Sequence, residues 1–162
     1  MIEESISEWA EKFFEKKLSD AKLGEFFLFF CRKDGVTLYK TGSYPLKGDT
    51  DSIGVLLSGA WQAAEMVSSL SLKSKNESFR FTFDTSSQGI YILPLTIQSS
   101  QYYLGTLYCN QVNPGHLKKK LRLLVNSFKE EIGQFEKGHR EKDNLLFQNI
   151  TDEEMSDIFS FR

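Results

Sequence analysis

The spacing of apolar residues along the chain predicts three helices and five strands. A first helix is indicated by Ile2, Ile6, Trp9 and Phe13, which recur at helical spacing with polar residues between them. The apolar, aromatic-rich run over residues 25–32 is too short for a typical helix. It therefore predicts a central strand that is covered on both faces.

A hairpin and three further strands follow from turn signals and alternation. The dipeptide Asp34-Gly35 tolerates positive φ and typically joins antiparallel strands, so residues 36–41 are the predicted second strand. Residues 78–84 alternate strictly between polar residues and phenylalanine, which indicates a half-buried strand suited to a sheet edge. The last two predicted strands span residues 90–98 and 102–110.

The helix predicted over residues 52–70 is apolar around most of its circumference. At roughly 100° per residue, its narrow polar arc contains only Gly54, Ser58, Gln62 and Glu65. A helix of this kind is buried on more than one side. Small residues on it would let another backbone come close, and these are Gly59, Ala60, Ala63 and Ala64.

Asn113-Pro114 predicts the start of a long last helix, because a capping side chain precedes proline at the first helical position. Residues 138–144 are charged and lack an apolar face, which indicates a linker. The sequence therefore predicts a domain over residues 1–137, this linker, and a C-terminal tail over residues 145–162.

The predicted tail combines acidic and large apolar residues. Thr151 followed by Glu154 is a capping-box pattern, and Met155, Ile158 and Phe159 share one side of the helical turn that it would start. A purely solvating tail would not carry these apolar side chains, so we expect it to fold on a partner or on its own domain. A disordered chain end is the alternative.

Composition and charge are those of a globular protein that needs no disulfide or metal for stability. The chain has 162 residues, of which 26% are charged, and its net charge of −2 excludes a broad basic footprint for nucleic acid. The acidic N-terminus lacks a signal-peptide pattern, and no apolar stretch approaches the roughly 20 residues that cross a bilayer. We therefore expect a cytoplasmic protein.

Candidate chemistry is sparse. The P-loop, Gly-x-Ser-x-Gly, His-Glu-x-x-His and Cys-x-x-Cys motifs are missing, and His116 and His139 are isolated from any ligand-like cluster. We expect no enzymatic activity, cofactor or metal. Cys31 and Cys109 lie in apolar runs and are interpreted as reduced core residues, with a disulfide between them left open.

A basic run begins the last predicted helix. This run consists of Lys118, Lys119, Lys120 and Arg122. Such a run is typical of a solvated face. Its alternative role is contact with an acidic partner, including the chain's own acidic residues 152–154.

The order helix-strand-strand-helix-strand-strand-strand-helix resembles the Roadblock/LC7 family over about residues 1–136. The resemblance is carried by residues 29–38, the alanine-rich helix 53–70, and the strand pair 89–95 and 103–108, with Pro94-Leu95 ending the first of that pair. It implies an α/β (α+β) fold with a five-stranded antiparallel sheet between the second helix and the first and last helices. It also implies a homodimer in which the second helices pack together and the third strands extend the sheet.

The resemblance implies a function in protein binding. Roadblock proteins serve as platforms for Ras-like small GTPases, as dynein light chains, or as subunits of scaffold complexes. We therefore expect a non-catalytic homodimeric regulator or scaffold whose partner is a Ras-like small GTPase, similar to bacterial polarity regulators. The expected dimer contacts are Val55, Gly59, Ala60, Ala63, Met66, Phe79 and Phe81. The expected partner contacts are Trp61, Gln62, Glu65, Met155, Ile158 and Phe159.

Three interpretations remain open beside these expectations. Trp61 suits a core or dimer-contact residue as well as a partner contact. A dimeric secretion chaperone is also small and acidic with exposed apolar strips, but it has three strands before its middle helix, where we expect two. A ligand sensor of the PAS or GAF kind would need a pocket within the aromatic core.

Overall fold

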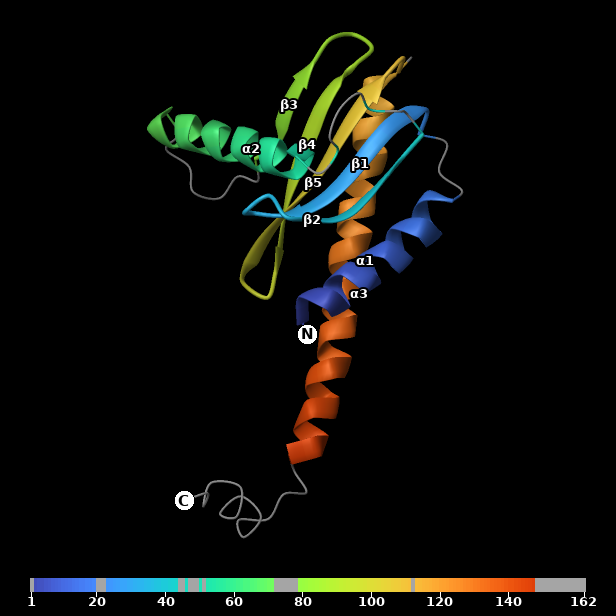
Figure 1. The fold of residues 1–162 in the computed structure, drawn as a ribbon, viewed down its shortest axis with the longest axis vertical. Helices are drawn as coiled ribbons and strands as arrows, with labels where there is room; N and C mark the ends of the chain where they lie inside the picture. The colour runs from blue at the N-terminus through green and yellow to red at the C-terminus, as the bar shows by residue number, and fades with distance from the viewer. Residues whose placement is uncertain are drawn as a thin grey trace. The chain divides into compact units, whose positions relative to one another are not determined.

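The computed structural model of the chain describes residues 2–19, 23–43, 46, 50, 52–71, 79–111 and 113–147. Its elements follow the predicted order (Figure 1): α1 (Ile2–Leu18), β1 (Glu25–Arg32), β2 (Thr37–Gly42), α2 (Ser52–Ser71), β3 (Phe81–Asp84), β4 (Gly89–Ile97), β5 (Ser100–Cys109) and α3 (Pro114–Phe147). The chain divides into two compact units, residues 1–127 and 128–162. No helix in the described ranges is both long and apolar enough to span a membrane.

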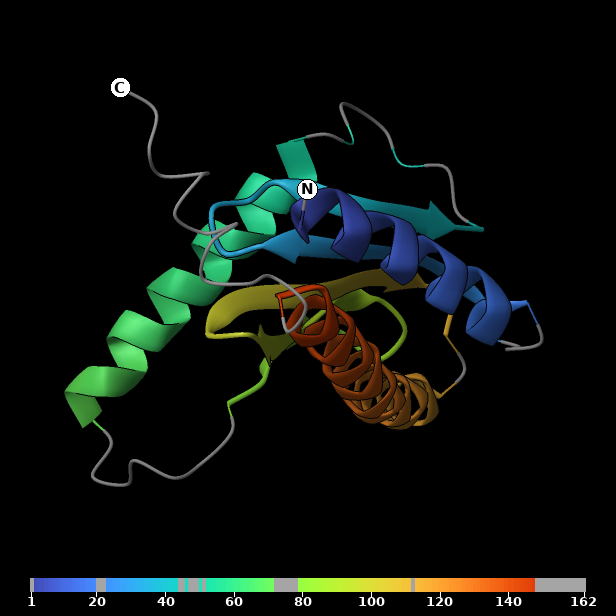
Figure 2. The ribbon, with the colours of Figure 1, turned by 90° about the horizontal axis from the view of Figure 1, so that it is seen from below.

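The five strands form one antiparallel sheet in the order β2-β1-β5-β4-β3. The β1–β2 turn closes at Asp34-Gly35, where the Arg32 amide donates to the Val36 carbonyl at 2.9 Å and Gly35 has a φ of +91°. β3 lies at an edge of the sheet, as its alternation predicted. Figure 2 shows α1 lying along β1 and β2. The structure therefore confirms the predicted α+β fold.

β1 is covered on both faces, as its continuous apolar run predicted. On one face, Phe29 and Cys31 belong to the core cluster that contains Leu57 and Trp61 of α2. On the other face, the Phe30 ring lies 5.9 Å from that of Phe14 in α1. β1 therefore lies between the two hydrophobic layers of the domain and contributes side chains to both.

The seating of α2 on the sheet depends on glycine in β5. A Cβ atom at Gly105 would lie 2.6 Å from Cδ1 of Leu57, a distance that real Cβ contacts essentially never show. The N-terminal turn of α2 is equally close to the β1–β2 turn, since a Cβ atom at Gly54 would clash with the Gly35 carbonyl oxygen. Two glycines thus let α2 approach the sheet and its hairpin.

Both cysteines are free. Cys31 is buried, and burial raises the pKa of its thiol to about 12, in keeping with a core residue. Cys109 is only half-buried, and its thiol lies 3.2 Å from a carboxylate oxygen of Glu25. The interpretation of both cysteines as core residues is therefore correct for the first and wrong for the second.

The last helix begins where the sequence predicted and ends later. Asn113 caps it, since its Oδ1 accepts a hydrogen bond from the His116 amide at 3.1 Å. Residues 138–144, interpreted as a linker, are helical and continue α3 to Phe147. Lysine, glutamate and arginine are good helix formers, so the lack of an apolar face did not end the helix. Residues 148–162 of the predicted tail lie outside the described residues, and the division into domain and tail stays a prediction.

We expect Gly105→Val to destabilise the domain, because the added side chain overpacks the contact with Leu57. The free energy of unfolding should fall by about 1–3 kcal/mol, measured by urea denaturation. The control is Gly133→Ala in α3, where a Cβ atom meets nothing within 4 Å. Its stability should stay equal or rise by up to about 1 kcal/mol. An unchanged midpoint for Gly105→Val would refute the tight seating of α2.

Candidate protein-binding surface

Part of the polar arc of α2, at Ser58 and Gln62, faces the β1–β2 turn. Ser58 is buried and its hydroxyl donates a hydrogen bond to the backbone carbonyl of Lys33 in the β1–β2 turn. Gln62 donates to the same carbonyl at 3.1 Å and to the Ser58 hydroxyl at 3.0 Å. Ser58 and Gln62 therefore form hydrogen bonds with the β1–β2 turn, whereas Glu65 is exposed.

The outward side of α2 is apolar as a consequence. Met66 is 72% exposed and Leu70 is 87% exposed, whereas an ordinary surface helix turns such residues inward. A Cβ atom at Gly59 would meet nothing within 4 Å, so the backbone is open at the middle of this side. We call this surface the α2 face, and it consists of Val55, Leu56, Gly59, Ala63, Met66, Val67 and Leu70.

β3 adds exposed aromatic rings beside the α2 face. Among the described residues it pairs with β4 alone, through Phe81 opposite Ile92 and Phe83 opposite Ile90, and Phe83 is largely exposed. A hollow of about 130 Å³ lies between α2 and this strand, with Glu65 among its lining residues. An apolar edge strand presents unpaired backbone groups, which makes it a template for pairing with another strand.

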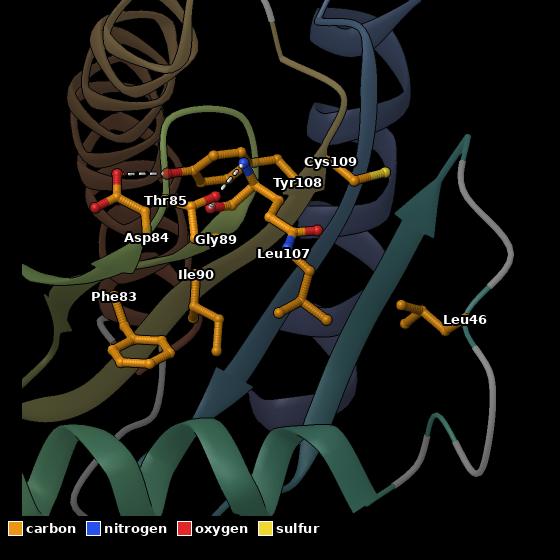
Figure 3. A pocket seen from close by; sticks show the side chains of 10 residues that line it. Leu46, Phe83, Asp84, Thr85, Gly89, Ile90, Leu107, Tyr108 and Cys109 are labelled. Atoms are coloured by element: carbon orange, nitrogen blue, oxygen red, sulfur yellow. Dashed lines mark hydrogen bonds between the residues drawn. The ribbon is translucent and has the colours of Figure 1, made fainter.

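A larger pocket of about 340 Å³ opens at the β3–β4 end of the sheet (Figure 3). Phe83, Ile90 and Leu107 point to the same side of the sheet as α2, so the apolar surface continues from the helix across the strands. Burial, followed by the Glu25 carboxylate, raises the pKa of the Cys109 thiol at its margin. A thiol of this kind is a poor nucleophile.

A polar network fastens β3 to the first turn of α3. The Tyr108 hydroxyl donates to the Asp84 carboxylate at 2.8 Å, and the Lys118 ammonium forms an ion pair with the same carboxylate. Lys118 also lies 5.7 Å from the centroid of the Tyr91 ring. These contacts, the lysine first and the tyrosine second, lower the pKa of Asp84. One cation of the basic run therefore has a structural role.

The predicted dimer contacts lie on one surface. Val55, Gly59, Ala63, Met66 and Phe79 are exposed there, and Ala60 and Phe81 are half-buried. Four further exposed residues of the same surface escaped the prediction: Leu56, Val67, Leu70 and Phe83. Leu56, Val67 and Leu70 could have been found from their position on the helix opposite the polar arc. Phe83 could have been found from the alternation of β3.

Three of the predicted partner contacts, Trp61, Gln62 and Glu65, lie on α2 within the described residues. Trp61 is 4% exposed and its ring lies 5.5 Å from that of Tyr103, which favours a core residue over a partner contact. Gln62 is bonded to the Lys33 carbonyl, and Glu65 is exposed. The other predicted contacts, Met155, Ile158 and Phe159, lie outside the described residues.

Solved structures share this architecture, although no protein-family model and no curated protein matches the chain. The gliding protein MglB of Thermus thermophilus aligns with a TM-score of 0.58 and 16% identity, covering 73% of this chain and 84% of that chain. Myxococcus xanthus MglB aligns with a TM-score of 0.59 and 14% identity, over 76% and 86% of the chains. A Roadblock/LC7 domain from Streptomyces avermitilis aligns with a TM-score of 0.56 and 13% identity, over 75% and 95%.

The chain has the Roadblock/LC7 fold. Two strands, β1 and β2, precede the middle helix of this fold in the described residues, and they make the first half of the sheet. A secretion chaperone would have three strands before that helix. The strand count therefore disfavours this alternative and agrees with the Roadblock/LC7 resemblance.

We expect Asp84→Asn to lower stability near neutral pH, because the ion pair with Lys118 is lost. Since the folded-state pKa of Asp84 is lowered, its stabilising charge is present above the unfolded-state pKa and is lost as pH falls through the folded-state pKa. The difference in urea midpoint between wild type and variant should therefore shrink below roughly pH 4. Glu130→Gln, at an exposed site on α3, is the control and should leave the midpoint unchanged. A difference that is independent of pH would contradict this assignment.

Proposed function

We propose that the chain is a non-catalytic regulatory platform that forms a homodimer through the α2 face and β3 and binds a Ras-like small GTPase. The observation that carries the proposal is the orientation of α2, in which Ser58 and Gln62 are bonded to the β1–β2 turn while Met66, Val67 and Leu70 are exposed. Apolar patches of this kind on a soluble protein mark interaction sites.

The composition of the α2 face suits a second copy of the same face. Gly59 and Ala63 at its middle let two helix backbones approach, while the large residues Val55 and Leu56 at one end and Met66 and Leu70 at the other supply apolar area. The exposed edge of β3 lies beside it and can pair with its counterpart. Self-association also occurs within this fold, since one MglB structure is described with a tetrameric arrangement.

The expected GTPase partner follows from the Roadblock/LC7 resemblance. The pocket beside α2 offers the anatomy of a protein contact, with Phe83, Ile90 and Leu107 as an apolar centre and Asp84 and Gln88 at a polar rim. Any activation of the GTPase would act by reshaping the switch regions of the partner, because the sequence offers no convincing arginine finger.

The ligand-sensor alternative is supported less well. It requires a pocket enclosed by the aromatic core, between α2 and the sheet. There, Trp61 packs against Tyr103 and Leu57 packs against Gly105. These contacts fill the space that a ligand would need.

Wild-type protein should have about twice the 18.6 kDa chain mass by light scattering at low micromolar concentration, and Ala63→Glu should halve that mass. Ala63 is exposed in the single chain, so the variant should fold, but its carboxylate would be buried and unpaired in the dimer at a cost of several kcal/mol. Ser69→Glu is the matched control, because it adds the same charge to α2 about 120° away around the helix. A wild type that is monomeric at all concentrations would end the proposal.

We expect tagged wild-type chain and Ser69→Glu to capture a Ras-like small GTPase from native lysate supplied with GTP or GDP, identified by mass spectrometry. Ala63→Glu should capture at least tenfold less, because the platform needs the dimer. The captured GTPase, once purified, should bind wild type directly by calorimetry. Recovery of no small GTPase in either nucleotide state would refute the GTPase assignment while leaving the dimer untouched.

A further inference from the structure

A second apolar surface lies away from the α2 face, between the end of α1 and the first turns of α3. We call it the α1–α3 groove. Its volume is about 270 Å³, and its apolar lining is formed by Leu18, Leu23, Leu121, Leu123 and Leu124.

The groove is not explained by the proposed dimer. Leu123, on the polar-rich helix α3, is 59% exposed. No residue of α2 or β3 lines the groove. Exposed leucines that border a concave surface are typical of a site that receives an apolar segment. The dimer proposed above would leave these leucines in contact with water.

Positive charge borders the leucines on both sides. Lys17 of α1 and Lys120 of α3 line the groove, and Lys16 and Lys119 are exposed next to them in the sequence. An apolar floor with a basic margin selects an occupant that is apolar on one side and acidic on the other.

The chain itself carries a segment with that chemistry. Residues 151–161 contain four carboxylates, at Asp152, Glu153, Glu154 and Asp157. Interleaved with them are Met155, Ile158 and Phe159, which a helix would place on one side as anchors spaced by three and four residues. A helix of this length is not stable alone in water, where roughly 12–15 residues are marginal, so it needs a surface on which to form.

We propose that residues 151–161 of one copy of the chain occupy the α1–α3 groove of another copy. Met155, Ile158 and Phe159 pack on the groove leucines, and the carboxylates of the segment face Lys17 and Lys120. This contact uses no residue of the α2 face, so it joins dimers into larger assemblies. One MglB structure of the same fold is described with a tetrameric arrangement, which gives a precedent for assembly beyond a dimer.

Charge reversal tests the pairing directly. In light scattering at tens of micromolar protein and low salt, wild type should exceed the dimer mass, and Lys17→Glu with Lys120→Glu should return it to that of the dimer. Glu153→Lys with Glu154→Lys should do the same. An equimolar mixture of the two double variants should recover the larger species, because each reversed groove then meets a reversed tail.

Controls separate this contact from folding defects and from the dimer. Lys12→Glu with Lys129→Glu reverses two exposed lysines outside the groove lining and should keep the larger assembly. Leu123→Ser removes an exposed leucine and should abolish the assembly without changing the circular dichroism spectrum. Ala63→Glu chains lack the α2 contact, but they should still associate through the tail. Adding Lys17→Glu and Lys120→Glu to Ala63→Glu should abolish that association.

The opposite results are equally clear. A wild type that never exceeds the dimer mass would overturn the proposal, whether the groove is empty or holds the tail of its own chain. A larger assembly that survives both charge reversals would also overturn it. If Ala63→Glu is already without effect on mass while the reversals act as expected, the dimer proposal fails and the tail contact stands.

Discussion

The close seating of α2 on the sheet is the contact on which the remaining surface depends. Leu57 packs on β5 at Gly105, which has no side chain, and Trp61 lies beside Tyr103. Once this side of the helix is fixed on the sheet, the rotation of α2 about its own axis is fixed as well. The exposure of Met66 and Leu70 follows from that rotation.

Hydrogen bonding selects the same rotation. The Lys33 carbonyl lies at the end of β1, and it accepts from both Ser58 and Gln62. Turning the helix to hide its apolar side would break both of these hydrogen bonds, and a hydrogen bond of this kind contributes about 0.5–1.5 kcal/mol to stability. The protein thus satisfies its polar groups inside and leaves apolar area outside, where another protein can cover it.

The β3 edge of the sheet is held by side chains of β5 and α3. β3 has four residues and one strand neighbour, yet Asp84 at its end is held by Tyr108 of β5 and by Lys118 of α3. This anchoring keeps the Phe83 ring beside the pocket floor formed by Ile90 and Leu107. A surface that is ordered before binding loses less conformational entropy when a partner arrives.

The sequence by itself determined the element order, the Asp34-Gly35 hairpin, the edge position of β3 and the start of α3, because local turn chemistry, capping and periodicity decide these features. It also indicated that α2 has more apolar surface than packing on one face of the sheet would bury. Only the tertiary structure decided which side of α2 is buried, since that choice depends on Gly105 and on the distant Lys33 carbonyl. The sequence also did not predict that residues 138–144 are helical. An apolar stripe indicates which side of a helix is buried, and its absence does not mean that the helix ends.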